Sequence, residues 1–144
     1  MISGNIIFIN LRIILPTVII VAETAEEFIE RKKQKEIGRL IKVKDISRKG
    51  HHFLKVVAAT YMTETDNPEK VFEILRLEHQ KSEGEKDQIA KYKFKDSYRF
   101  GYYIIGKIRN KKDKWTWGQY APMIPTMDLL PLIEKAKEEG TIKE

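Results

Sequence analysis

Cationic and aromatic side chains occur together in residues 98–120, the part of the chain best equipped for chemistry. Lysine and arginine neutralise phosphates, whereas flat rings stack on bases, and nucleic-acid binding uses both. If the segment forms a two-stranded hairpin, its tip carries several lysines just before two tryptophans. We therefore predict a non-enzymatic module that contacts DNA or RNA through these side chains: Arg99, Lys107, Arg109, Lys111, Lys112, Lys114, Trp115 and Trp117.

The same residues are open to a second explanation. Aromatic rings are also what a sheet buries beneath helices, and lysines at a hairpin tip hinder edge-to-edge aggregation. The alternative function is a protein-interaction or assembly domain of a larger prokaryotic complex, in which exposed rings and the apolar amino-terminal segment meet a partner or a second copy. Phosphate binding weakens steeply with salt and apolar association does not, so salt separates the two hypotheses.

Motifs for catalysis are absent from the sequence. No glycine-rich loop precedes Lys-Ser or Lys-Thr to cradle a phosphate, and no serine has a nucleophile-elbow pattern. Glu30, Arg31 and Lys32 match a Glu-x-Lys nuclease element, but such matches arise by chance in a charge-rich helix. An enzyme is the third hypothesis, and it would draw its carboxylates from Glu64, Asp66, Asp96 and Asp113.

Metal and cofactor chemistry are not predicted. His51 and His52 are neighbours that would point to opposite faces of a strand, and His79 is expected on a helix surface. The chain has no cysteine, which excludes disulfides, thiolate nucleophiles and cysteine-based zinc sites. A cysteine-free chain fits a reducing compartment, so we predict a cytoplasmic protein without cofactor or metal.

Length and charge narrow the class of protein. A chain of 144 residues with 42% hydrophobic residues can bury one core without disulfides or metal, so we predict a single domain over residues 1–144. The net charge of +6 favours nucleic acid, an anionic membrane or an acidic protein over a cationic partner.

The most apolar stretch covers residues 2–22. Arg12 lies in its middle rather than ahead of it, which argues against a signal peptide, and Pro16 divides it into 6–15 and 17–21. These pieces are rich in β-branched residues and have the lengths of strands. We predict two buried strands here; a membrane anchor is the weaker alternative, and a membrane partner is not expected.

Helices are predicted from capping patterns and spacing. Thr24 and Glu27 form a capping box ahead of a helix that ends near residue 37, before Gly38. Asn67 followed by Pro68 predicts a second helix over 68–81, with apolar residues at helical spacing. Asp128 is expected to cap a third helix, with its inward face formed by Leu129, Leu132, Ile133 and Ala136.

Strands complete the predicted fold. They are expected over 40–46, 53–62, 89–94, 98–109 and 115–120, with hairpin turns at 47–50 and 110–114 and an exposed loop at 82–87. Strands outnumber helices without regular alternation of the two. We predict an α+β fold in which about three helices pack on a mainly antiparallel sheet of about five to six strands.

Overall fold

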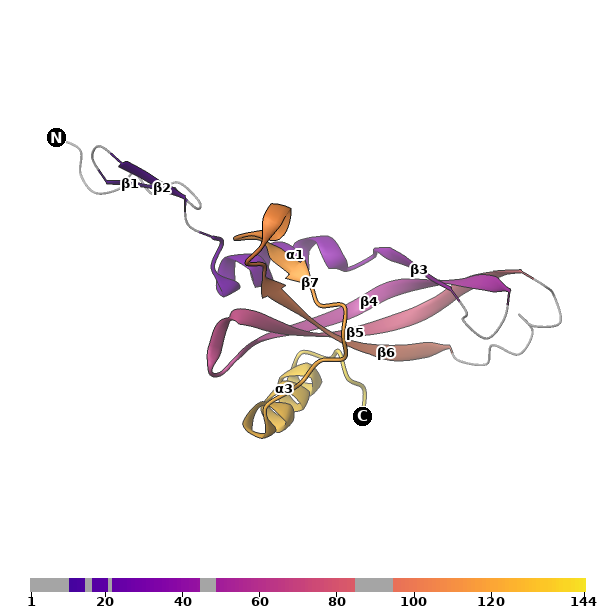
Figure 1. Ribbon diagram of the computed structural model, residues 1–144. Helices are drawn as coiled ribbons and strands as arrows, with labels where there is room; N and C mark the ends of the chain where they lie inside the picture. The colour runs from indigo at the N-terminus through magenta and orange to yellow at the C-terminus, as the bar shows by residue number, and fades with distance from the viewer. Residues whose placement is uncertain (1–10, 15–16, 21, 45–48, 85–94) are drawn as a thin grey trace.

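The computed structural model describes residues 11–14, 17–20, 22–44, 49–84 and 95–144. The fold is α+β, as predicted, with a five-stranded antiparallel sheet between two helices, α1 (Ala25–Glu36) and α3 (Thr126–Glu138). Figure 1 shows α1 and α3 on opposite sides of the sheet, and each covers its own cluster of buried side chains. Over the described residues these are the only α-helices, fewer than the predicted three.

The sheet follows the order of the chain. β3 (Leu40–Lys44), β4 (Gly50–Glu64), β5 (Asn67–Gly84), β6 (Asp96–Ile105) and β7 (Trp115–Trp117) each pair with the next strand. β4 and β5 are the longest, with 15 and 18 residues, and form the central hairpin. The predicted hairpins of 40–46 with 53–62 and of 98–109 with 115–120 are confirmed, with altered ends.

The predicted helix over 68–81 is wrong, because these residues belong to β5. Residues 71–75 are buried at every position, since β5 has a strand on each side and a helix over each face. A strand covered on both faces needs apolar residues in succession, and such a run also satisfies helical spacing. The predicted loop at 82–87 is wrong in its first part, because Ser82 and its neighbours continue β5 to Gly84 in pairing with the start of β4. The rest of that loop, 85–87, lies outside the described residues.

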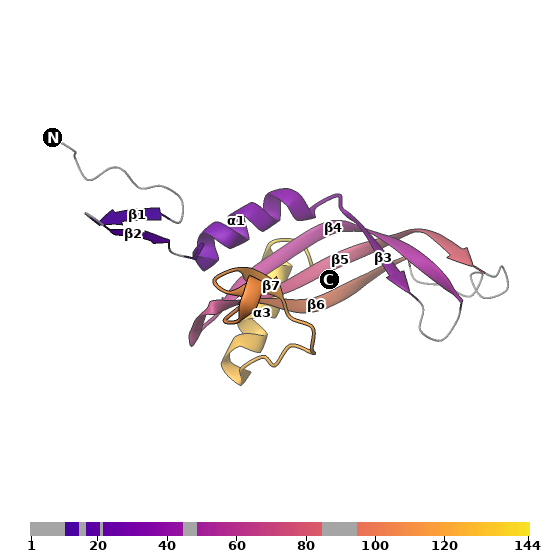
Figure 2. The same cartoon turned by 45° about the horizontal axis from the view of Figure 1, so that its top comes forward.

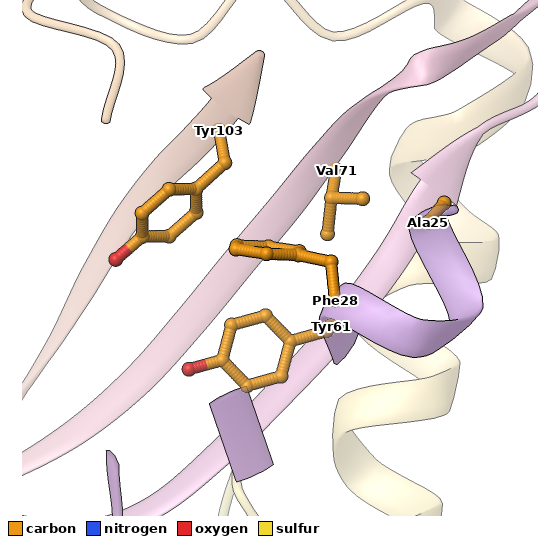
Figure 3. Packing of buried hydrophobic residues seen from close by; sticks show 5 residues of the cluster. All are labelled: Ala25, Phe28, Tyr61, Val71 and Tyr103. Carbon is orange, nitrogen blue, oxygen red and sulfur yellow. The ribbon is translucent and has the colours of Figure 1, made fainter. Parts of the chain in front are cut away.

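α1 begins as its sequence predicts. The Glu27 backbone N–H donates to the Thr24 hydroxyl at 3.2 Å, and the Thr24 N–H donates to the Glu27 carboxylate at 2.9 Å. The helix ends before Gly38, whose φ of 89° is favourable only for glycine. Figure 3 shows Phe28 reaching from α1 toward Tyr61 and its neighbours on the sheet, so this helix is anchored by one buried ring.

Asp128 does not cap α3, contrary to the prediction. The helix starts at Thr126, and Asp128 is a buried residue of its first turn. Its carboxylate accepts hydrogen bonds from the backbone N–H of Thr65, at 3.0 Å, and from the Thr65 hydroxyl. Asp128 therefore fastens the start of α3 to the turn between β4 and β5 instead of satisfying the helix itself.

The buried stripe of α3 runs through Asp128, Leu132 and Ala136, at a spacing of four residues. Leu132 and Ala136 pack on Phe72, Ile74 and other side chains of the sheet face that α3 covers. Leu129 was expected to face inward, but it lies beside this stripe and is exposed. The inward face of α3 is therefore narrower than its apolar sequence indicates.

Two short strands precede α1. β1 (Leu11–Ile14) and β2 (Thr17–Ile20) pair antiparallel. Two strands were predicted here, and their predicted burial stays a prediction. Figures 1 and 2 both show this hairpin apart from the five-stranded sheet. The rest of the predicted strand 6–15, Val21 and the predicted strand 89–94 lie outside the described residues. In the described part of the chain no helix is long and apolar enough to cross a membrane.

Replacement of Leu132 by alanine should lower the free energy of unfolding by about 2–5 kcal/mol, because its 0% exposed side chain fills the space between α3 and the sheet. The matched control is Leu130→Ala on the same helix, where a 70% exposed side chain should cost less than about 0.5 kcal/mol. Urea denaturation followed by circular dichroism measures both. Equal losses would show that α3 does not dock through Leu132.

Candidate functional site

A pocket of about 500 Å³ opens between the carboxyl-terminal half of α1 and strands β6 and β7. The α1 residues that line it form two pairs four positions apart, Arg31 with Lys35 and Lys32 with Glu36, which places them on one side of the helix. Five cationic side chains, one carboxylate and two aromatic rings form its wall: Arg31, Lys32, Lys35, Glu36, Arg39, Arg99, Tyr103 and Trp117.

Glu36 is the carboxylate in the wall of the pocket, and it is almost completely buried. It accepts hydrogen bonds from Lys32 Nζ at 3.1 Å and from Arg39 Nε at 2.9 Å. Burial favours the neutral acid, but the hydrogen bonds from Arg39 and Lys32 outweigh it, and the pKa of Glu36 falls below its ordinary value. Glu36 thus stays charged and holds two cations at the rim.

Glu73, on β5, is a second carboxylate and is 0% exposed. Its Oε1 atom lies 3.5 Å from Nη2 of Arg99, a residue of the pocket wall. Burial raises the pKa of Glu73, and the negative charge of Glu36 raises it further, although the Tyr61 hydroxyl and Arg99 act in the opposite direction. The site therefore holds two carboxyl groups whose pKa values are displaced in opposite directions.

Cations already lie over the aromatic rings of the pocket. The Arg99 guanidinium carbon is 4.9 Å from the ring centroid of Trp117, and Lys32 Nζ is 4.6 Å from that of Tyr103. The edge of one ring meets the face of the other, with 5.1 Å between the centroids of Tyr103 and Trp117. Trp117 also covers Gly101, where any added Cβ would collide with the indole ring.

Trp115 takes part in packing. Its ring stacks on Phe28 with 4.7 Å between centroids, and its Nε1–H donates to the Glu23 carbonyl at 2.8 Å. These contacts join β7 to the start of α1, so the hairpin tip is held against the helix (Figure 2). The ring leaves little surface for a ligand base, because it is only partly exposed.

The remaining predicted residues lie at the hairpin tip, beyond the end of β6. The chain turns there through a 3₁₀ helix, η1 (Arg109–Lys111), and Gly106 N–H donates to the Lys114 carbonyl at 3.0 Å. Lys107 forms an ion pair with Glu69 at 2.6 Å. All five cations of the tip are exposed: Lys107, Arg109, Lys111, Lys112 and Lys114.

Apart from Trp115, which packs on Phe28, the predicted residue set is divided between two places. Arg99 and Trp117 lie in the pocket, whereas the basic tip carries the other predicted cations. The α1 cations were missed because a charged helix face is usually only solvated; their spacing beside the buried Phe28 was the available signal. Glu73 was hidden by the incorrect helix over 68–81. Of the candidate acids, Glu64 pairs with Lys70 and Asp96 with Lys143.

No protein-family model, curated protein or solved structure matches this chain. Its class is therefore defined by the molecule alone, as an α+β domain with a basic pocket between its first helix and the edge of its sheet. Among the residues that the structure describes, no group of three or more His, Cys, Asp or Glu side chains is placed to hold a metal ion.

Glu73 should make stability depend on pH with a definite sign. Because its pKa is higher in the folded than in the unfolded protein, the folded state binds the proton more tightly, and stability falls as the pH rises above about 4.5. Glu73→Gln removes this loss, so its stability relative to the wild type should increase from about pH 4 to pH 8. Denaturant unfolding across this range measures the difference.

The matched control is Glu36→Gln, for which the sign is opposite. The pKa of Glu36 is lowered by folding, so its stabilising contribution is present above the unfolded pKa and is lost as the pH falls through the folded one. Glu36→Gln should therefore lose stability relative to the wild type as the pH rises. Parallel pH profiles for the two variants would contradict the opposite displacement of these pKa values.

Proposed function

We propose that the chain is a non-enzymatic module that binds nucleic acid, with one phosphate in the pocket and neighbouring phosphates along the basic tip. The single observation that supports this most strongly is the group of five cations around one pocket, contributed by α1, the segment that follows it and β6. Lysine and arginine gathered from distant parts of a chain provide the phosphate contacts that dominate nucleic-acid affinity.

The charge balance of the pocket favours an anion. Arg31 forms an ion pair with Glu23 at 2.7 Å. Glu36 pairs with both Lys32 and Arg39. Glu73 lies beside Arg99. Three carboxylates therefore face five cations, and the raised pKa of Glu73 reduces the negative charge further. Lys35 forms no ion pair within the described residues. A phosphate would supply the missing negative charge.

The basic tip extends this surface. Lys111, Lys112 and Lys114 are exposed, and the Trp115 contact with Glu23 ties their loop to the helix that carries the pocket cations. Lysine is a point charge on a flexible stem, suited to following a phosphate backbone without reading bases. Since both tryptophan rings are already packed, we infer binding that depends on phosphates more than on base stacking.

A protein-interaction domain is the second candidate, and a different surface favours it. Five large apolar side chains are exposed in the segment 120–130, at the approach to α3 and on its first turns: Tyr120, Met123, Met127, Leu129 and Leu130. Exposed apolar groups of this kind are common where one protein docks on another. This surface involves neither the pocket nor the basic tip.

Intrinsic tryptophan fluorescence, titrated with single-stranded and duplex DNA and RNA, tests the nucleic-acid hypothesis. Saturable quenching is expected, with affinity falling about tenfold or more between about 50 and about 200 mM salt. The triple variant Lys111→Glu, Lys112→Glu, Lys114→Glu should bind more weakly, and its slope of log affinity against log salt should be smaller by about 2–3 on duplex DNA.

The control changes the same number of charges elsewhere, with Lys55→Glu, Lys81→Glu and Lys137→Glu together. This variant has the same net charge as the tip variant, and its affinity should stay closer to that of the wild type. Equal losses in both variants would reduce the effect to net charge. No response to any nucleic acid at the lower salt would overturn the proposal and leave the protein-interaction surface as the one to test.

A further inference from the structure

Two histidines on neighbouring strands converge on one hydroxyl group. His52, near the start of β4, places Nδ1 2.7 Å from Ser82 Oγ, and His79, on β5, places Nε2 2.6 Å from the same oxygen. Their ring centroids are 5.8 Å apart, and the rings are inclined at 59°. One point in space is therefore within hydrogen-bonding reach of two imidazole nitrogens.

An irregularity of the strand pairing creates this convergence. His52 lies opposite Ser82 and Leu54 opposite His79, so two steps on β4 correspond to three on β5, and Gln80 is the extra residue. In a regular strand Ser82 and Gln80 would share a face, and His79 would point to the other. The bulge turns His79 to the side of Ser82 and His52, and bulges often redirect a side chain at functional sites.

Imidazole nitrogens are preferred ligands of Zn²⁺, Cu²⁺ and Ni²⁺, and they bind as the neutral base. A metal–nitrogen bond is about 2.0–2.1 Å long. An ion that binds both rings therefore requires the Ser82 hydroxyl, which lies between them, to rotate aside, and each ring to move inward by roughly half an ångström.

We propose that His52 and His79 form a binding site for a late first-row divalent metal ion, with the Ser82 hydroxyl as a neighbouring ligand or hydrogen-bond partner and water completing the coordination. The ion would link β4 to β5 near the end of the central hairpin. Copper should bind more tightly than zinc or nickel, as expected for nitrogen ligands. The site shares no residue with the basic pocket, so it is independent of nucleic-acid binding.

Isothermal titration of the untagged full chain with Zn²⁺, and separately with Cu²⁺, tests this site. One equivalent of ion should bind, and His52→Ala and His79→Ala should each weaken binding by about tenfold or more. The matched control is His51→Ala, which removes the adjacent histidine of β4, on the opposite face, and should leave the affinity unchanged. Circular dichroism verifies that each variant is folded.

A measurement on the unmodified protein covers the case in which a variant fails to fold. Addition of Zn²⁺ should shift the ¹⁵N resonances of His52 and His79 in imidazole-detected spectra and leave those of His51 in place. Shifts of all three rings, of His51 alone or of none would overturn the proposal. Equal loss of affinity in the His51→Ala variant would do so as well, since it would reveal binding by surface imidazoles in general.

Discussion

Burial of β5 on both of its faces is the constraint on which the rest of the structure depends. Val71 packs with the buried residues of α1, whereas Phe72 and Ile74 pack with those of α3. Each fully buried apolar side chain of this kind contributes about 1.5–3 kcal/mol. Both helices are needed, because removal of either one would expose buried apolar side chains of β5 to water. The alternation that sorts these side chains also places Glu73 on the α1 side, where no water reaches it. The unusual acid of the pocket is therefore a consequence of the central position of its strand.

Local signals predicted the parts of the fold that local interactions determine. The α1 capping box is made within four residues, Thr24 to Glu27, and the structure contains both of its hydrogen bonds. The helix predicted over 68–81 failed because the burial of residues 71–75 is decided by both neighbouring strands and both helices, which no short window contains. Asn67 was expected to cap that helix. Its side chain does accept a hydrogen bond from the Glu69 backbone N–H, but the residues that follow form a strand instead of a helix.

The candidate site was predictable only where it is continuous in the sequence. Arg99, Trp117 and the basic tip belong to a single hairpin, so their charge and aromatic content were visible at once. The cations of α1 come from another part of the chain, and their arrival beside β6 depends on Phe28 and Trp115, which meet across the helix–sheet contact. The same limit applies to His52 and His79, whose proximity depends on the strand assignment of β5 and on a bulge that composition does not reveal.

The chain-order pairing of the sheet also has a kinetic consequence. Since β3 to β7 each bind the strand next to them in sequence, every ladder closes a short loop, and the sheet can form without waiting for distant segments. The helices differ in this respect. α1 is made before the strands it covers, but α3 is made after all of them, so Phe72 and Ile74 have no cover while the sheet is being synthesised. During that interval the nascent sheet exposes an apolar face to solvent. Binding by a chaperone would be most favourable at this stage, before α3 covers that face.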